Sequence, residues 1–121
     1  MDIRIKTTDF EMTDAIAKYL DERIAHIEKL LGTDAGQARC EVEIGRDAGR
    51  PRHGANIFFA EFTLIRPGMD YLRATNRSES INGAIDDAKA ELEMQFKNTK
   101  RVSRRIARKA GATIKRLLRR G

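Results

Sequence analysis

The sequence has few of the residues on which several classes of protein depend. Its 121 residues include one cysteine, two histidines and no tryptophan. Cys40 alone cannot form an internal disulfide, and one cysteine with two histidines is a poor set of zinc ligands. No apolar run approaches the roughly 20 residues that cross a bilayer, and Met1–Lys6 lacks the apolar stretch of a secretion signal. We therefore expect a cytoplasmic protein rather than a secreted, membrane-spanning or zinc-stabilised one.

The motifs that carry common enzyme chemistry are also missing. The sequence has no glycine-rich phosphate loop, no paired-histidine zinc motif and no serine-nucleophile elbow. Asp86 and Asp87 are neighbours on a predicted helix and lie about 100° apart, so their carboxylates do not converge as those of a hydrolase do. Neither histidine has the partners of a catalytic triad nearby in the sequence. We expect no enzymatic activity, no cofactor and no metal.

Acidic residues are absent from the C-terminal segment, and this absence divides the charge. From Lys97 to Gly121 there are 11 basic residues and no acidic ones, whereas residues 1–96 carry 13 basic and 18 acidic residues, a net charge of −5. A long stretch of one sign repels itself unless a polyanion neutralises it. Nucleic acid is the favoured partner, because each neutralised phosphate releases counterions. An anionic membrane surface is the main alternative.

Hydrophobic periodicity predicts the elements of the first half. Alternation over residues 2–7 predicts a strand. Thr13 is the predicted N-cap of a helix, and Gly32 is predicted to lie just past its end. Residues 38–44 alternate again and predict a strand with Cys40 on its buried face, as a structural thiol. The apolar stripe of the helix consists of Ile16, Leu20, Ile24, Ile27 and Leu31.

The second half continues with a loop, two strands and a long helix. Residues 46–54 are predicted to form a loop, which is either a hairpin connection or a finger that contacts phosphates. Residues 56–66 predict an interior strand whose phenylalanines pack in the core rather than stack on RNA bases. A turn at 66–69 leads to a strand over 71–75. Ser78 or Ser80 caps the second helix, whose apolar stripe enters the basic segment, with a break or hinge favoured near Gly111. That stripe begins with Ile81, Ile85, Ala88, Leu92, Phe96 and Thr99.

The order β-α-β-β-β-α predicts an α+β fold. A strand–helix–strand unit makes the first two strands parallel through a right-handed crossover, and short connections make the others an antiparallel meander. Each helix has one apolar stripe, so both should cover the same face of a four-stranded mixed sheet in a two-layer sandwich. We expect a domain over residues 1–102 and a basic C-terminal tail over residues 103–121.

Two groups of residues stand in a familiar order. The first comprises Met1-Asp2-Ile3-Arg4-Ile5, Met12-Thr13-Asp14-Ala15-Ile16, Tyr19-Leu20 and Ile27-Glu28-Lys29-Leu30; the second comprises Ala84-Ile85-Asp86-Asp87-Ala88, Leu92-Glu93-Met94-Gln95, Lys97 and Lys100. The ordered set resembles the ribosome hibernation promoting factor family, also called ribosome-associated inhibitor or sigma-54 modulation proteins, in its short form. Ser80 and Asn82 depart from it, because the family usually has Asp and Tyr there. The basic tail matches no element of the family.

The resemblance implies a protein that binds the small (30S) ribosomal subunit and its rRNA, within the 70S ribosome, in the channel used by mRNA and tRNA. It also implies that this binding blocks translation under stress. The expected phosphate contacts are Arg23, Lys29, Lys89, Lys97, Lys100, Arg101, Arg104, Arg105 and Arg108, followed by Arg4, Lys6, Arg73 and Arg77. No small-molecule substrate is expected. The alternatives are a general RNA-binding protein and a peripheral membrane module that uses the basic amphipathic segment 102–118.

Overall fold

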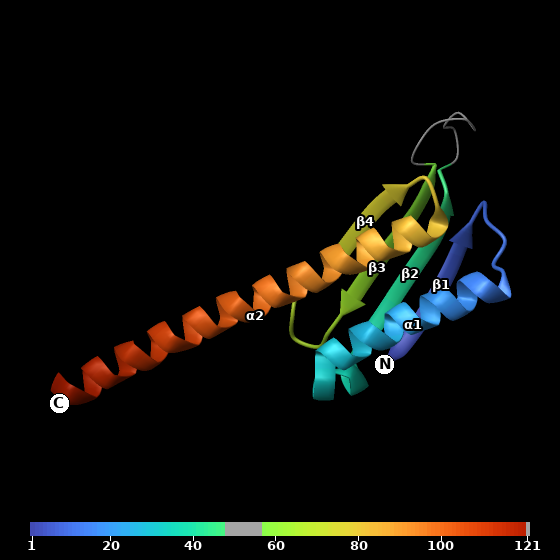
Figure 1. Ribbon diagram of the computed structural model, residues 1–121. Helices are drawn as coiled ribbons and strands as arrows, with labels where there is room; N and C mark the ends of the chain where they lie inside the picture. The colour runs from blue at the N-terminus through green and yellow to red at the C-terminus, as the bar shows by residue number, and fades with distance from the viewer. Residues whose placement is uncertain (48–56, 121) are drawn as a thin grey trace.

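A computed structural model describes residues 1–47 and 57–120, with side chains described as far as Val102 (Figure 1). The elements follow the predicted order, with a short 3-10 helix added after the first helix. They are β1 (Asp2–Thr8), α1 (Asp14–Leu31), the 3-10 helix η1 (Gly32–Gln37), β2 (Arg39–Arg46), β3 (Phe58–Ile65), β4 (Leu72–Ser78) and α2 (Ile81–Arg120). Most of the loop expected at 46–54 lies outside the described residues, and with it the choice between a connection and a phosphate finger.

The four strands form one mixed sheet in the order β1-β2-β3-β4. β1 pairs with β2 in parallel, and the remaining pairs are antiparallel, as predicted. β4 extends three residues beyond the predicted end, because Asn76, Arg77 and Ser78 continue the ladder with β3. Those polar residues show no hydrophobic alternation, so the pattern alone could not reveal the pairing. At the other edge, Ile3 and Ile5 of β1 remain 39% and 44% exposed.

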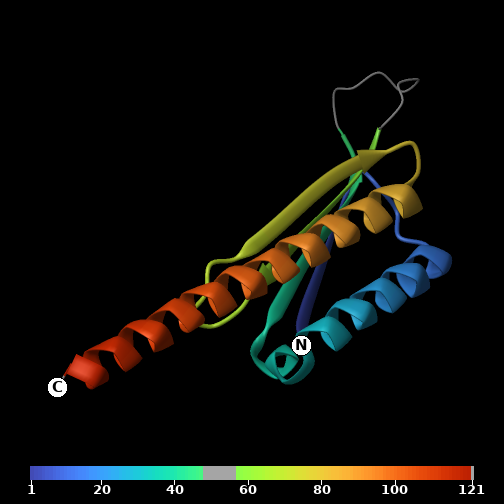
Figure 2. The same cartoon turned by 60° about the vertical axis from the view of Figure 1, so that its left-hand side comes forward.

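Both helices cover the same face of the sheet, as expected (Figure 2). Their apolar stripes meet the buried side chains of the strands, and Phe62 at the centre of β3 is fully buried. Burying a side chain of this kind stabilises the fold by about 1.5–3 kcal/mol. Cys40 is also fully buried, and burial raises the pKa of its thiol to about 12. The predictions of a phenylalanine core and of a structural thiol are confirmed.

Local hydrogen bonds explain where the helices begin and end. The Oγ1 of Thr13 accepts from the backbone N–H of Ile16 at 3.2 Å and caps α1. Gly32 follows α1 with a φ of 62°, a conformation that glycine adopts without strain. Of the two residues predicted as caps of α2, Ser80 is the N-cap, because its Oγ accepts a hydrogen bond from the backbone N–H of Gly83 at 3.0 Å.

α2 is a single helix of 40 residues and is therefore about 60 Å long. It passes through Gly111 without a break, so the expected interruption is absent. A glycine costs a helix only about 1 kcal/mol relative to alanine, and the backbone hydrogen bonds continue on both sides of it. The first half of α2 packs on the sheet, and the second half extends beyond it (Figure 1).

Candidate nucleic-acid interface

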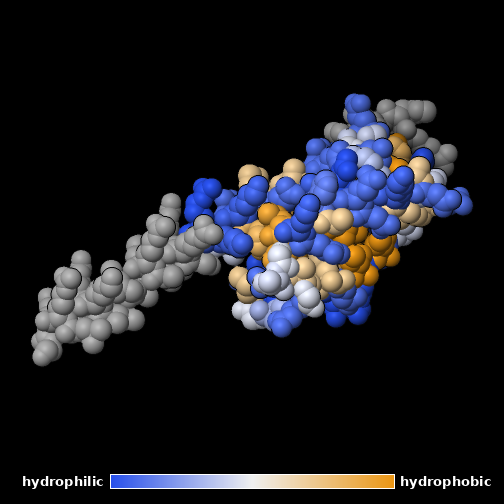
Figure 3. Space-filling model, turned by 60° about the horizontal axis from the view of Figure 1, so that its bottom comes forward, coloured by the Kyte–Doolittle hydropathy of each residue, from blue (hydrophilic) through white to orange (hydrophobic). Residues whose placement is uncertain are grey.

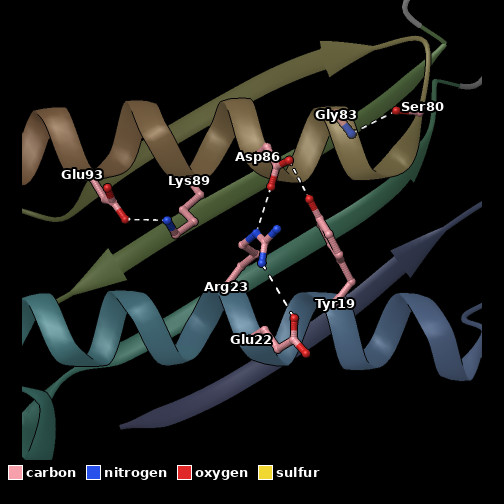
Figure 4. A network of polar contacts seen from close by, with 8 residues as sticks. All are labelled: Tyr19, Glu22, Arg23, Ser80, Gly83, Asp86, Lys89 and Glu93. Carbon is pink, nitrogen blue, oxygen red and sulfur yellow. Dashed lines mark hydrogen bonds and ion pairs between the residues drawn. The ribbon is translucent and has the colours of Figure 1, made fainter.

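α1 and α2 lie side by side and run in the same direction, so their C-terminal ends face the same way (Figures 1 and 4). Leu31 in the last turn of α1 belongs to the same buried cluster as Leu92 and Phe96 of α2, and Leu30 packs against that cluster. Lys29 therefore lies at the end of the helix layer from which the basic half of α2 leaves the body. Figure 3 shows hydrophilic residues gathered at this point.

Four of the predicted contacts at this end have no acidic partner within the described residues. Lys29, Lys97, Lys100 and Arg101 are all exposed. None of them forms an ion pair with a carboxylate in the described part of the chain. The Nζ of Lys100 lies 5.2 Å from the centre of the Phe96 ring, and Phe96 is itself buried in the core. These cations are therefore available to an anion from outside the protein.

Arg23 is differently placed, because it is part of a network that joins the two helices (Figure 4). Its Nε donates to Oδ1 of Asp86 at 3.0 Å, and the hydroxyl of Tyr19 donates to Oδ2 of the same carboxylate at 2.5 Å. The guanidinium carbon lies 4.1 Å from the centre of the Tyr19 ring. The charge of Arg23 is thus partly neutralised within the protein.

The same network perturbs the pKa values of its members. Burial acts to raise the pKa of Asp86, but hydrogen bonds from Tyr19 and Arg23 outweigh it, and this pKa lies below its ordinary value. The hydrogen bond to Asp86 raises the pKa of Tyr19 and also that of Arg23. At neutral pH the carboxylate and the guanidinium are charged and the phenol is neutral, so the pair joins α1 to α2.

Lys89 is also paired. Its Nζ lies 2.8 Å from Oε1 of Glu93, one turn further along α2, and its side chain is only 17% exposed (Figure 4). A Lys–Glu pair at this spacing is a normal feature of a helix surface. Sequence reasoning proposed Lys89 as a contact without considering this partner, although the spacing was a signal for it.

The remaining predicted contacts of α2 are Arg104, Arg105 and Arg108. The backbone of α2 is helical at these positions, but their side chains lie outside the described part of the structure. Continuation of α2 as one helix places all three on the same element as Lys97 and Arg101.

The second group of candidates lies on the strands and is paired throughout. The Nε of Arg4 lies 3.5 Å from Oδ2 of Asp2, and the Nζ of Lys6 lies 4.0 Å from Oε1 of Glu43. The Nε of Arg73 lies 3.0 Å from Oε1 of Glu61. Arg77 donates a hydrogen bond to Asp47, which raises the pKa of this arginine. The strand cations therefore belong to a surface of mixed sign, in contrast to the end of the helix layer.

The described residues provide neither a metal site nor a membrane span. They contain no cluster of three or more histidine, cysteine or acidic side chains placed to hold a metal ion. None of the helices in this part of the chain combines the length and the apolar character needed to span a membrane.

Comparison with known proteins gives one family. Residues 3–104 match the model of the family described as sigma 54 modulation protein / S30EA ribosomal protein, whereas no curated protein matches. The N-terminal domain of Thermus thermophilus Protein Y is 27% identical, with a TM-score of 0.62 over 82% of this chain and 99% of that one.

A second solved structure has the same fold at lower identity. It is a ribosomal subunit interface protein from Coxiella burnetii, 12% identical, with a TM-score of 0.65 over 83% of this chain and 98% of that one. The family match includes β1 from residue 3, α1, the other three strands and α2 as far as residue 104. The chain therefore belongs to the sigma 54 modulation protein / S30EA ribosomal protein family.

Proposed function

We propose that this protein associates with the ribosome, binds the small subunit in the channel used by mRNA and tRNA, and thereby blocks translation. The observation that carries the proposal is a set of exposed cations at one end of the helix layer in a member of a ribosomal protein family. None of the four, Lys29, Lys97, Lys100 and Arg101, has an ion-pair partner among the residues that the structure describes. RNA phosphates are the polyanion that such a set binds, and each neutralised phosphate releases counterions.

The distribution of charge along α2 supports one orientation on RNA. Residues 81–96 of this helix contain four acidic residues and one basic residue, whereas the segment beyond them has no acidic residue. Lys29 lies in the last turn of α1, where a cation also interacts favourably with the helix dipole. In the proposed complex the C-terminal end of the helix layer approaches rRNA, and the acidic half of α2 stays away from it.

The mechanism is occlusion and needs no reacting group. The family consists of non-enzymatic ribosomal factors, so the chain is not an enzyme. A structured RNA channel presents phosphates and shape more than base edges, and cations on a rigid helix suit that surface. Occupation of the channel excludes mRNA and tRNA by steric overlap. The site of action in this proposal is the cytoplasm, where ribosomes translate.

The predicted contacts then fall into groups of different expected strength. Lys97, Lys100, Arg101 and Lys29 contribute most, because binding does not require them to leave a carboxylate. Arg104, Arg105 and Arg108 extend the contact along α2. Arg23 and Lys89 contribute less, because each must share its charge with the acidic partner that it already has.

Sedimentation of the protein with purified ribosomes through a sucrose gradient tests the proposal. We expect saturable binding of one molecule per small subunit, lost at high salt and displaced by mRNA and tRNA together. Binding that does not saturate, or that mRNA and tRNA leave unchanged, would indicate a general RNA-binding protein. Pelleting with anionic vesicles but not with ribosomal particles would indicate a membrane partner and would reject the proposal.

A further inference from the structure

Arg66 is a buried cation that the sequence placed at the end of a predicted strand and the start of a predicted turn. It follows β3 directly and is 7% exposed. Its Nη2 donates to the backbone oxygen of Asp70 at 3.5 Å, a distance at the limit for a hydrogen bond. Its Nε is enclosed and has no hydrogen-bond partner within the described structure. No carboxylate of the described residues forms an ion pair with it.

A second cation lies near Arg66, on α2. The guanidinium carbon of Arg66 lies 5.5 Å from the centre of the Phe96 ring, and the Nζ of Lys100 lies 5.2 Å from the centre of the same ring. Figures 1 and 2 both show the turn between β3 and β4 beside the middle of α2. Two positive charges therefore lie near the same aromatic ring, and neither forms an ion pair with a carboxylate of the described residues.

Beside this pair of cations the surface is hollowed. The hollow has a volume of about 660 Å³ and is lined by Arg66, Gly68, Met69, Asp70, Leu72 and Thr99. This volume lies within the range of small-ligand sites. Asp70 contributes a single exposed carboxylate to the rim, against the two positive charges of Arg66 and Lys100. The Thr99 hydroxyl donates to the backbone oxygen of Gln95, which leaves the hydroxyl oxygen only as an acceptor.

We infer that this hollow binds a phosphate-class oxyanion, with the Arg66 guanidinium as its principal ligand. A buried charge without a partner is costly, and a guanidinium has five N–H donors, of which one donates to a protein acceptor within the described residues. Phosphate oxygens match the fork of an arginine and can accept two parallel hydrogen bonds from it. Lys100 adds long-range attraction from the neighbouring turn of α2. The inference does not depend on the proposed function.

The phosphate group has two chemical sources, a phosphodiester of RNA or a free phosphate. Titration of the whole protein with orthophosphate, and separately with a short single-stranded RNA, distinguishes them when backbone amide resonances are followed by NMR. Sodium chloride at matched ionic strength is the control in both titrations. We expect saturable shifts of the Gly68 and Met69 amides with at least one of the two probes. Shifts with RNA alone assign the site to RNA, and shifts with orthophosphate assign it to a free phosphate.

Arg66→Met tests the ligand, because it keeps an apolar side chain against Phe96 and removes every donor. We expect it to weaken binding of the active probe by roughly tenfold or more. Lys18→Met removes one charge from an exposed position on α1, outside every contact proposed above, and should leave binding in the hollow unchanged. If Arg66→Met does not fold, Arg66→Lys keeps the charge but loses the two-donor geometry, and it should also bind more weakly. Absence of saturable shifts with both probes, or equal binding by the folded Arg66 variant, would overturn the inference.

Discussion

Replacing Lys97, Lys100 and Arg101 together with alanine removes three exposed cations that have no carboxylate partner in the described part of the chain. If all three contact rRNA phosphates, each contributes about 0.7–0.9 to the slope of log affinity against log salt concentration. The variant should therefore have a slope shallower by about 2–3 units. Over a fourfold rise in salt, wild type should lose about 16- to 64-fold more affinity than the variant loses.

The assay is sedimentation of ribosome-bound protein at several salt concentrations, with a second triple variant as the matched control. Arg4, Lys6 and Arg73 carry the same number of charges but are each paired with a carboxylate on the strands. Their replacement by alanine should leave the slope close to that of wild type. Equal changes in both variants would refute the link between pairing and binding. Loss of affinity without a change of slope in the first variant would show that its three residues do not contact phosphates.

Three further predictions concern the scaffold. Deletion of residues 103–121 should leave a folded body, because every buried core residue of the described structure precedes this segment; circular dichroism and a cooperative thermal transition check this. Gly45→Ala should destabilise the fold by about 1–3 kcal/mol in denaturant unfolding, since the added Cβ would lie 1.9 Å from the backbone oxygen of Thr8. Gly36→Ala is the control and should not destabilise the fold in this way, because its Cβ would meet nothing within 4 Å. Asp86→Asn should cost about 0.2–1 kcal/mol at pH 7. Because the folded pKa of Asp86 is lowered from 3.8, the difference from wild type should be fully present above pH 3.8 and should shrink as the pH falls through the lower, folded pKa; a difference that does not change with pH would contradict this origin.

The sequence was sufficient for the fold because each element carries its own local signal. The stripe of α1 and the cap at Thr13 lie within the element that they specify. The directions of the strands follow from the lengths of their connections, and these are also local. The predicted end of β4 was wrong, because the true end depends on backbone pairing with β3 rather than on the side chains of β4.

The candidate site was less predictable, because it depends on which charges meet across the fold. Arg23 and Asp86 are 63 positions apart, and only the packing of α1 against α2 brings them together. Asp86 and Asp87 are equivalent in the sequence, yet only Asp86 reaches the other helix. The burial of Arg66 has no sequence signal either, since a charged residue in a predicted turn is usually exposed. The predicted rRNA contacts remain predictions until binding is measured.

α2 continues without interruption from the hydrophobic core into the basic segment. The packing of its first half therefore fixes both the position of the second half and its rotation about the helix axis. The side of the helix from which Lys97 and Arg101 project is set by the burial of Leu92 and Phe96, which come just before them in α2. Insertion of one alanine between Phe96 and Lys97 would turn the distal half by about 100° and advance it by about 1.5 Å. The composition of the core and the total charge would stay the same. Mutations that keep every cation can therefore still change the direction in which the cations point. Selection can thus act on the number of residues between the buried half of this helix and its basic half.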